Sequence, residues 1–155
     1  MMKKLFEYNW QVRKEWFELC KQIGHEQLVK KRAGGLGNFI DTLSHIIVVE
    51  YDWIQDLKGK QVYDFSKDDY QTIDDVISFH ERLHQEVREF VSGWTEEIGK
   101  KTLTLPNGES YNFEVVMNHI IAHEIHHMGQ LSVWAREIGV TPVSANLVNR
   151  GLYES

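Results

Sequence analysis

The sequence predicts an all-α protein of one domain, a bundle of four long helices with a short β-hairpin before the last of them. Four stretches repeat apolar residues at every third or fourth position, the spacing of a helix that buries one face. Only 2 prolines interrupt the 155 residues, and helix-forming Leu, Glu, Lys and Gln are frequent. This length suits one hydrophobic core, so we expect a single domain over residues 1–155.

The first two helices are predicted over residues 3–23 and 36–57. Apolar residues recur at helical spacing through the first, and Gly24 follows it as a stop. The glycine-rich stretch 34–37 is interpreted as a turn, because it lacks the Lys-Ser/Thr ending of a phosphate loop and follows no strand. Residues 46–49 are apolar on nearly every side of the second helix, which should therefore lie deep in the fold.

The third helix is predicted over residues 72–94, after a polar crossover loop at residues 60–71. Thr72 or Asp74 is the expected N-cap, because both side chains accept hydrogen bonds from free helix amides. Apolar residues then recur at helical spacing to the end of the segment.

The hairpin and the fourth helix are predicted over residues 101–113 and 113–138. Thr and Leu alternate before Asn107-Gly108, a dipeptide that is typical of tight hairpin turns. The fourth helix is expected to stop at Gly139. A short tail helix is predicted over residues 143–152.

Charge and cysteine content exclude several function classes. The formal net charge is −6 and no basic stripe is visible, which argues against nucleic-acid binding. Cys20 is the only cysteine, so no internal disulfide can form, as is usual in a reducing compartment. The N-terminus has no signal-peptide core, and no apolar run approaches the ~18 residues of a membrane span. We therefore expect a cytoplasmic protein with no membrane partner.

Four of the eight histidines fall within nine residues of the predicted fourth helix. At about 100° per residue, His123 and His127 project toward the apolar face, whereas His119 and His126 lie further round, toward solvent. The inward pair has i, i+4 spacing, which places two imidazoles on adjacent turns of one face. Burying them without a partner is costly, so either carboxylates or a metal ion must satisfy them, and the spacing favours a shared metal ion.

A third metal ligand has to come from another helix. His25 lies in a predicted loop, and His80 and His84 have charged neighbours, so their side of the third helix is interpreted as solvated. His45 instead adjoins the apolar run 46–49. It is either a ligand, which we favour, or a buried histidine bonded to a backbone carbonyl.

The letters from His123 to His127 also match the H-E-x-x-H motif of zinc proteases, in which the Glu is a general base. Here Glu124 should point to the other side of the apolar stripe from His123. No strand-rich part of the chain is predicted that could bind a peptide as an added strand. The protease interpretation is therefore disfavoured.

Three motifs of the chain, in the order in which they occur, resemble those of the DinB/YfiT family of metal-binding four-helix proteins. They are Tyr8-Asn9-Trp10 in the first helix, Thr42-Leu43-Ser44-His45 with Glu50 and Trp53 in the second, and the His-x-x-x-His-x-Gly-Gln pattern that ends at Gln130 in the fourth. One departure is Met128, where many members have Arg.

The resemblance implies a bundle with up-down-down-up topology that is often a homodimer. It also implies that His45, His123 and His127 bind zinc, nickel or a similar divalent metal ion. Some members are similar to thiol-dependent transferases, which use bacterial low-molecular-weight thiols, or to isomerases.

Several functions remain open at this point. Three neutral histidines leave a coordination position at which a bound thiol would give an S-transferase and a bound water a hydrolase. The site could instead be a non-catalytic structural metal centre, or the chain a ligand-sensing or partner-binding module. Gln130 is either a contact to a metal ligand or substrate, or a surface residue. Glu50 is either a partner of a metal ligand or a solvated charge.

Overall fold

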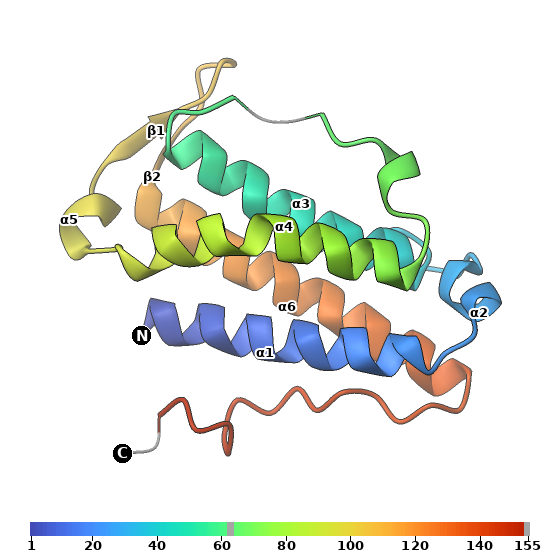
Figure 1. Ribbon diagram of the computed structural model, residues 1–155. Helices are drawn as coiled ribbons and strands as arrows, with labels where there is room; N and C mark the ends of the chain where they lie inside the picture. Colours follow the sequence, from blue (N-terminus) through green and yellow to red (C-terminus); the bar gives the residue numbers. More distant parts are fainter. Residues whose placement is uncertain (62–63, 154–155) are drawn as a thin grey trace.

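The structure, a computed structural model, describes residues 1–61 and 64–153. It is mostly helical, with a two-stranded sheet at one end of the helices (Figure 1). The long helices are α1 (Met2–Lys21), α3 (Phe39–Leu57), α4 (Ile73–Ser92) and α6 (Phe113–Glu137). The short ones are α2 (His25–Val29), α5 (Glu96–Gly99) and a 3-10 helix at Lys67–Asp69. In the part of the chain that is described, no helix is long and apolar enough to cross a lipid bilayer.

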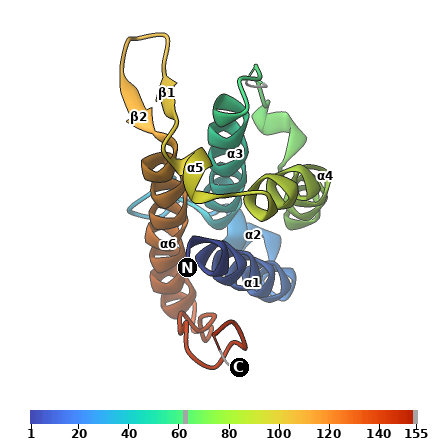
Figure 2. The same ribbon diagram turned by 90° about the vertical axis from the view of Figure 1, so that its left-hand side faces the viewer.

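The four long helices lie side by side. Helix α1 packs against α4 and α6, and α3 also packs against α4 and α6. In Figure 1, α1 and α6 run from left to right, whereas α3 and α4 run in the opposite direction. Figure 2 shows α3 beside α6 on one side of the molecule and α1 and α4 across from them. The α3/α6 pair and the α1/α4 pair therefore lie on opposite sides of the molecule.

Side-chain caps set where α3 and α4 begin. The Oδ1 atom of Asn38 accepts a hydrogen bond from the Asp41 amide (2.8 Å), so α3 begins at Phe39 and not at residue 36 as predicted. Helix α4 has the predicted cap Thr72, whose hydroxyl accepts from the Asp75 amide while the Asp75 carboxylate accepts from the Thr72 amide. This reciprocal pair is a capping box.

The predicted hairpin is confirmed. Strand β1 (Thr102–Thr104) pairs antiparallel with β2 (Ser110–Asn112), so that Thr102 lies opposite Asn112. Gly108 has φ +89°, the left-handed conformation that its missing side chain permits. Strand β2 runs directly into α6, so the hairpin lies at the start of the helix that carries the histidine cluster.

The predicted tail helix over residues 143–152 is wrong. This segment runs along α1 in an irregular path, and the Tyr8 hydroxyl donates a hydrogen bond to the Ala145 carbonyl (2.6 Å). The Arg150 guanidinium donates to the carbonyls of Ser144 and Asn146 and to both carboxylate oxygens of Glu15. The Arg150 side chain thus occupies backbone carbonyls that a helix would use for its own hydrogen bonds. The contacts with Tyr8 and Glu15 of α1 hold the segment in this irregular path.

The predicted polar crossover at residues 60–71 is largely irregular where it is described and contains the short 3-10 helix. Its residues 62 and 63 lie outside the described residues, as do residues 154 and 155 of the predicted domain.

The core consists of two apolar clusters with buried polar side chains between them. One cluster gathers around Trp16, Phe39 and Trp134, and the other around Phe6, Ile54 and Met117. Along each helix, the polar side chains lie between members of the two clusters. They are Asn9 and Arg13 from α1, Glu50 from α3, His80 from α4 and Glu124 from α6.

Candidate metal centre

Three histidine side chains meet between α3 and α6. The Nε2 atom of His123 lies 3.0 Å from Nε2 of His45 and 3.1 Å from Nε2 of His127. One ligand atom from each of the three residues lies within 4.8 Å of the others. The structure thus brings together the three histidines that the sequence selected, across 78 residues of chain.

Helix geometry and burial explain why these rings converge. His123 and His127 are one helical turn apart on α6, and His45 faces them from the neighbouring α3 beside the buried Ile46 and Ile47. His127 is only 7% exposed, whereas His45 and His123 are half-buried. The three nitrogen atoms therefore lie near the protein surface, on a rigid helical frame.

Gln130 fixes the orientation of His127. Its carbonyl oxygen Oε1 lies 2.8 Å from Nδ1 of His127, so Nδ1 carries the proton and donates it. The opposite nitrogen, Nε2, then keeps its lone pair free for a cation. The contact that the sequence allowed for Gln130 is present in the structure.

Gly35 makes room for Gln130. A Cβ atom at Gly35 would lie 2.1 Å from Oε1 of Gln130, and the backbone there has φ +50°. The glycine-rich loop, interpreted from sequence only as a turn, therefore covers a side chain of the candidate site. The sequence alone could not reveal this, because the contact joins residues that are far apart along the chain.

Burial keeps His123 and His45 neutral near pH 7. Burial lowers the pKa of His123 to about 4, with smaller contributions from the neighbouring His127 and His45. Burial, followed by the charge of His127, also lowers the pKa of His45. A single proton cannot satisfy three converging nitrogens, but a metal ion accepts all three lone pairs.

The three residues fit a divalent metal ion. Metal–nitrogen bonds of ~2.0–2.1 Å separate neighbouring ligand nitrogens by about 3.0 Å at right angles and about 3.3 Å in a tetrahedron. The observed 3.0 and 3.1 Å match this range. Within residues 1–61 and 64–153, the group contains no fourth His, Cys, Asp or Glu. Three protein donors leave at least one position for an outside ligand, as in catalytic zinc sites.

The other histidines considered as ligands lie outside this group. His119 and His126 are exposed, as their helical projection predicted, and His119 packs against the ring of Trp53. His25 begins the short helix α2 and is also exposed.

The prediction that His80 and His84 lie on a solvated face is wrong. His80 is only 4% exposed, and His84 is half-buried and stacks on it with ring centroids 4.5 Å apart. Their charged neighbours point outward, whereas the i, i+4 pair points between α1 and α4. Arg13 supplies the partner that the sequence did not show, because its Nη1 donates to Nδ1 of His80 (3.3 Å).

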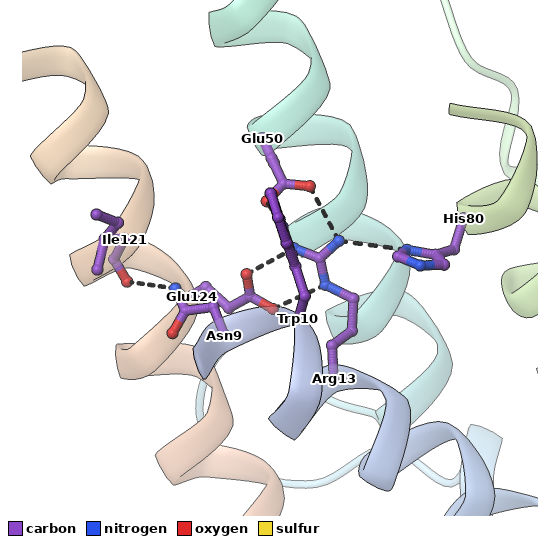
Figure 3. Close-up of polar contacts among 7 residues, drawn as sticks. All are labelled: Asn9, Trp10, Arg13, Glu50, His80, Ile121 and Glu124. Atoms are coloured by element: carbon purple, nitrogen blue, oxygen red, sulfur yellow. Dashed lines mark hydrogen bonds and ion pairs between the residues drawn. The ribbon is translucent and has the colours of Figure 1, made fainter. Parts of the chain in front are cut away.

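Arg13 is the centre of a buried polar network (Figure 3). It is 0% exposed and forms paired hydrogen bonds with the carboxylates of Glu124 (2.6 and 2.8 Å) and Glu50 (both 2.9 Å). The Trp10 indole also donates to Glu50 (3.0 Å). Glu50 is therefore not a solvated charge, and its bonds run to α1 and not to the three histidines.

Glu124 faces the core and not the histidine group. Both of its oxygens are bound by Arg13, so the Glu of the H-E-x-x-H letters is not placed as a base beside the candidate site. Burial, with help from the nearby Glu50, raises the pKa of Glu124 to about 7 although Arg13 opposes this. Burial alone would lower the pKa of Arg13, but the two carboxylates outweigh it and raise that pKa.

Arg13 was not predicted as a functional residue, although the sequence contains one signal for it. Arg13 lies three residues from both Trp10 and Trp16, within the apolar repeat of the first helix. A charged residue on a buried face implies a buried partner. The sequence does not say which of the many acidic residues that partner is.

Comparisons with known proteins agree with this fold. A family model described as "DinB family" matches residues 1–151. The chain is similar to the Bacillus subtilis protein YizA, at 44% identity over 153 residues, which are 97% of this chain and 96% of that protein.

Two solved structures share the fold. A DinB-like protein from Bacillus cereus matches with a TM-score of 0.63 and 18% identity, over 87% of this chain and 91% of that chain. A DinB-like protein from Bacillus subtilis, YjoA, matches with a TM-score of 0.61 and 17% identity, over 90% and 95% of the two chains.

Proposed function

This chain belongs to the DinB family, and on that premise we propose that it is a metal-dependent enzyme of the thiol S-transferase type. His45, His123 and His127 would hold one divalent ion, with zinc or nickel the best match to three imidazoles. The observation that carries the proposal is the meeting of three Nε2 atoms at 3.0 and 3.1 Å with no fourth protein donor in the described residues.

The residues of the chain prepare a position for a thiol. Gln130 keeps His127 in the tautomer whose Nε2 is free, and the lowered pKa of His123 keeps that ring neutral. A bound metal ion would lower the pKa of a coordinated thiol or water, so that a nucleophile exists near neutral pH. The half-buried His45 and His123 leave the outer side of the group open to such a ligand.

A small apolar pocket next to the histidines could receive the electrophile. It measures about 180 Å³ and is lined by Trp53, Tyr111, Val115, Val116 and His119. The ring of His119 is 6.0 Å from that of His123, so the pocket begins one helical turn from the candidate site. Its aromatic walls suit an apolar group on a small-molecule substrate.

The finer expectations from the family resemblance belong to the same proposal. They are an up-down-down-up four-helix bundle, a low-molecular-weight thiol as cosubstrate, a homodimer and a cytoplasmic location. The opposite directions of the α1/α6 and α3/α4 pairs support the first of these. Sedimentation of the purified protein would test the homodimer.

The test is a turnover screen of the zinc- or nickel-loaded protein, purified without a polyhistidine tag. Low-molecular-weight thiols are combined with electrophiles, and both thiol loss and thioether formation are followed. We expect turnover that His123→Ala abolishes. His126→Ala is the matched control, because His126 is exposed on the same helix and lies outside the group.

Three outcomes would contradict the proposal. If the substrate is cleaved without thiol consumption, the bound ligand is water and the protein is a hydrolase. If the metal binds but no substrate is turned over, the site is structural. If His123→Ala retains full turnover, the reaction does not occur at these histidines.

A further inference from the structure

A second and larger cavity lies on the opposite side of the molecule from the three histidines. Helices α1 and α4 enclose a cleft of about 730 Å³. Figure 2 shows these two helices across from the α3/α6 pair that carries the candidate metal centre. The walls include apolar Phe17 and Ile77, the stacked rings of His80 and His84, and the cationic Lys14 and Arg88.

The Arg13 network determines the protonation of His80. An arginine has only donors, so Nδ1 of His80 must accept the hydrogen bond from Arg13. The ring is therefore neutral with its proton on Nε2, on the side away from Arg13. Among the described residues, Nε2 has no hydrogen-bond partner. A side chain that is 4% exposed thus presents a free donor to the cleft that it lines.

His84 is the second polar group without a partner. Both of its ring nitrogens are buried, and neither has a hydrogen-bond partner in the part of the chain that is described. His84, Lys14 and Arg88 also line an adjoining cavity of about 210 Å³, so the three side chains lie where the two cavities meet.

Positive charges outnumber negative ones around the His84 ring. The cations that act most strongly on the His84 ring are Arg13, Arg88 and Lys14, and the carboxylate among these charges is Glu50. Glu50 is buried and already bound to Arg13.

Three carboxylates, Glu18, Glu81 and Glu89, also line the cleft. Glu18 pairs with Lys21 (2.9 Å), and Glu89 accepts a hydrogen bond from Gln85 (3.0 Å). Glu81 has no such partner among the described residues, but it lies on the Lys21 side of the cleft, where its charge acts on Lys21. Lys14 and Arg88 form no ion pair in the described structure, so their charges are available to a ligand.

We propose that this cleft binds a small organic anion. Its carboxylate or phosphate group would lie between Lys14 and Arg88, within reach of the His80 donor, and its apolar body would lie on Phe17 and Ile77. The site shares no residue with the candidate metal centre and does not depend on the proposed transferase activity.

The test compares two fluorescent probes that differ in one charged group. Anilinonaphthalene sulfonate is an aromatic anion, and phenylnaphthylamine has the same rings without the sulfonate. We expect saturable binding of the sulfonate, with one probe per chain, that weakens by about tenfold or more in Lys14→Gln/Arg88→Gln. Binding of the neutral probe should change little.

The matched control is Lys67→Gln/Lys100→Gln, which removes two positive charges at exposed positions outside the cleft and should bind the sulfonate like the parent protein. Equal loss of both probes, or no loss in the cleft variant, would overturn the proposal. So would sulfonate binding that appears only when the protein is diluted, because a second copy of the chain would then be covering the cleft.

Discussion

His127 shows how a single side chain can be prepared for metal binding before any ion arrives. Its Nδ1 donates a hydrogen bond to Gln130, and its Nε2 atom faces Nε2 of His123. Gln130 keeps its position because Gly35 has no side chain to displace it. The metal affinity of the site should therefore depend on residues that never touch the metal.

Gln130→Ala should weaken metal binding by about 10- to 100-fold, because His127 loses the partner that fixes its tautomer and ring orientation. Competition with a chromophoric chelator would measure the change. Gln130→Glu keeps an acceptor beside Nδ1 and should retain most of the affinity.

Gly35→Ala provides an independent check from the other side of this contact. Its new Cβ would push the Gln130 side chain away, so the change should act in the same direction as Gln130→Ala. Parent-like affinity in both alanine variants would show that the Gln130 contact has no role at this site.

At the scale of the element, the helix ends depend on a few side chains with defined partners. Thr72 and Asp75 satisfy each other's backbone amides at the start of α4, and the Asn38 side chain accepts from the Asp41 amide at the start of α3. These caps matter because α4 carries the buried His80 and α3 carries His45. The start of each helix therefore fixes the register of side chains deeper in the molecule.

Thr72→Ala should lower the free energy of unfolding by about 1 kcal/mol, because the Asp75 amide loses its acceptor. Urea denaturation of the metal-free protein would measure this. Thr72→Ser retains a hydroxyl and should lose much less. A fully stable Thr72→Ala variant would show that the capping box does not stabilise α4.

The elements that could be predicted from sequence are those whose signal is local. The four long helices follow from apolar spacing, and the hairpin follows from Asn107-Gly108. The short helices α2 and α5 are too brief to show a period. The tail was misassigned because its contacts run to α1, where Tyr8 binds the Ala145 carbonyl and Glu15 binds the Arg150 side chain.

The same distinction between local and distant signals applies to the residues of the candidate site. His123 and His127 could be found because they share one helix face, and His45 could be found because it adjoins an apolar run. Partners that come from distant segments could not be found, as with Gly35 for Gln130 and Arg13 for His80.

At the scale of the whole molecule, the Arg13 network joins all four long helices. Arg13 of α1 binds Glu50 of α3, His80 of α4 and Glu124 of α6 between the two apolar clusters of the core (Figure 3). The same arginine lies between the candidate metal centre on one side and the α1/α4 cleft on the other. A buried network of this kind fixes how the helices align, because any shift would leave charges unpaired.

Arg13→Met should lower the free energy of unfolding by about 3–5 kcal/mol, because two buried carboxylates lose their shared partner. Chemical denaturation would measure it, with the exposed Arg136→Met as a control that changes stability by less than about 0.5 kcal/mol. Adding Glu50→Gln and Glu124→Gln to Arg13→Met should recover part of the loss. If the free energy of unfolding does not recover, side-chain packing and not charge pairing determines the stability that Arg13 contributes.

The stability of the metal-free protein should fall as the pH is lowered from 6.5 toward 4. Burial and the nearby Arg13 lower the pKa of His80 to about 2 and that of His84 to about 4, from 6.5 in the unfolded chain. The unfolded chain therefore binds more protons in this range, which costs up to ~1.4 kcal/mol per pH unit for each histidine. Glu124 and Asp52 act in the opposite direction, since burial raises their pKa values to about 7 and about 6. The lowered pKa values of His123 and His45 add to the loss of stability, so the histidines outnumber the carboxyls.

Urea denaturation at several pH values, in the parent protein and in His84→Phe, would measure this dependence. The variant removes the contribution of His84 while it keeps a ring against Trp10. Its stability should therefore fall less steeply with decreasing pH. An identical slope in the two proteins would contradict the assignment to His84.

The central claim, a metal site formed by His45, His123 and His127, is tested most directly by metal analysis of protein purified without a polyhistidine tag. We predict about one divalent metal ion per chain, lost in each single alanine variant of these residues and retained in His119→Ala and His126→Ala. Full metal content in all three ligand variants would contradict the account.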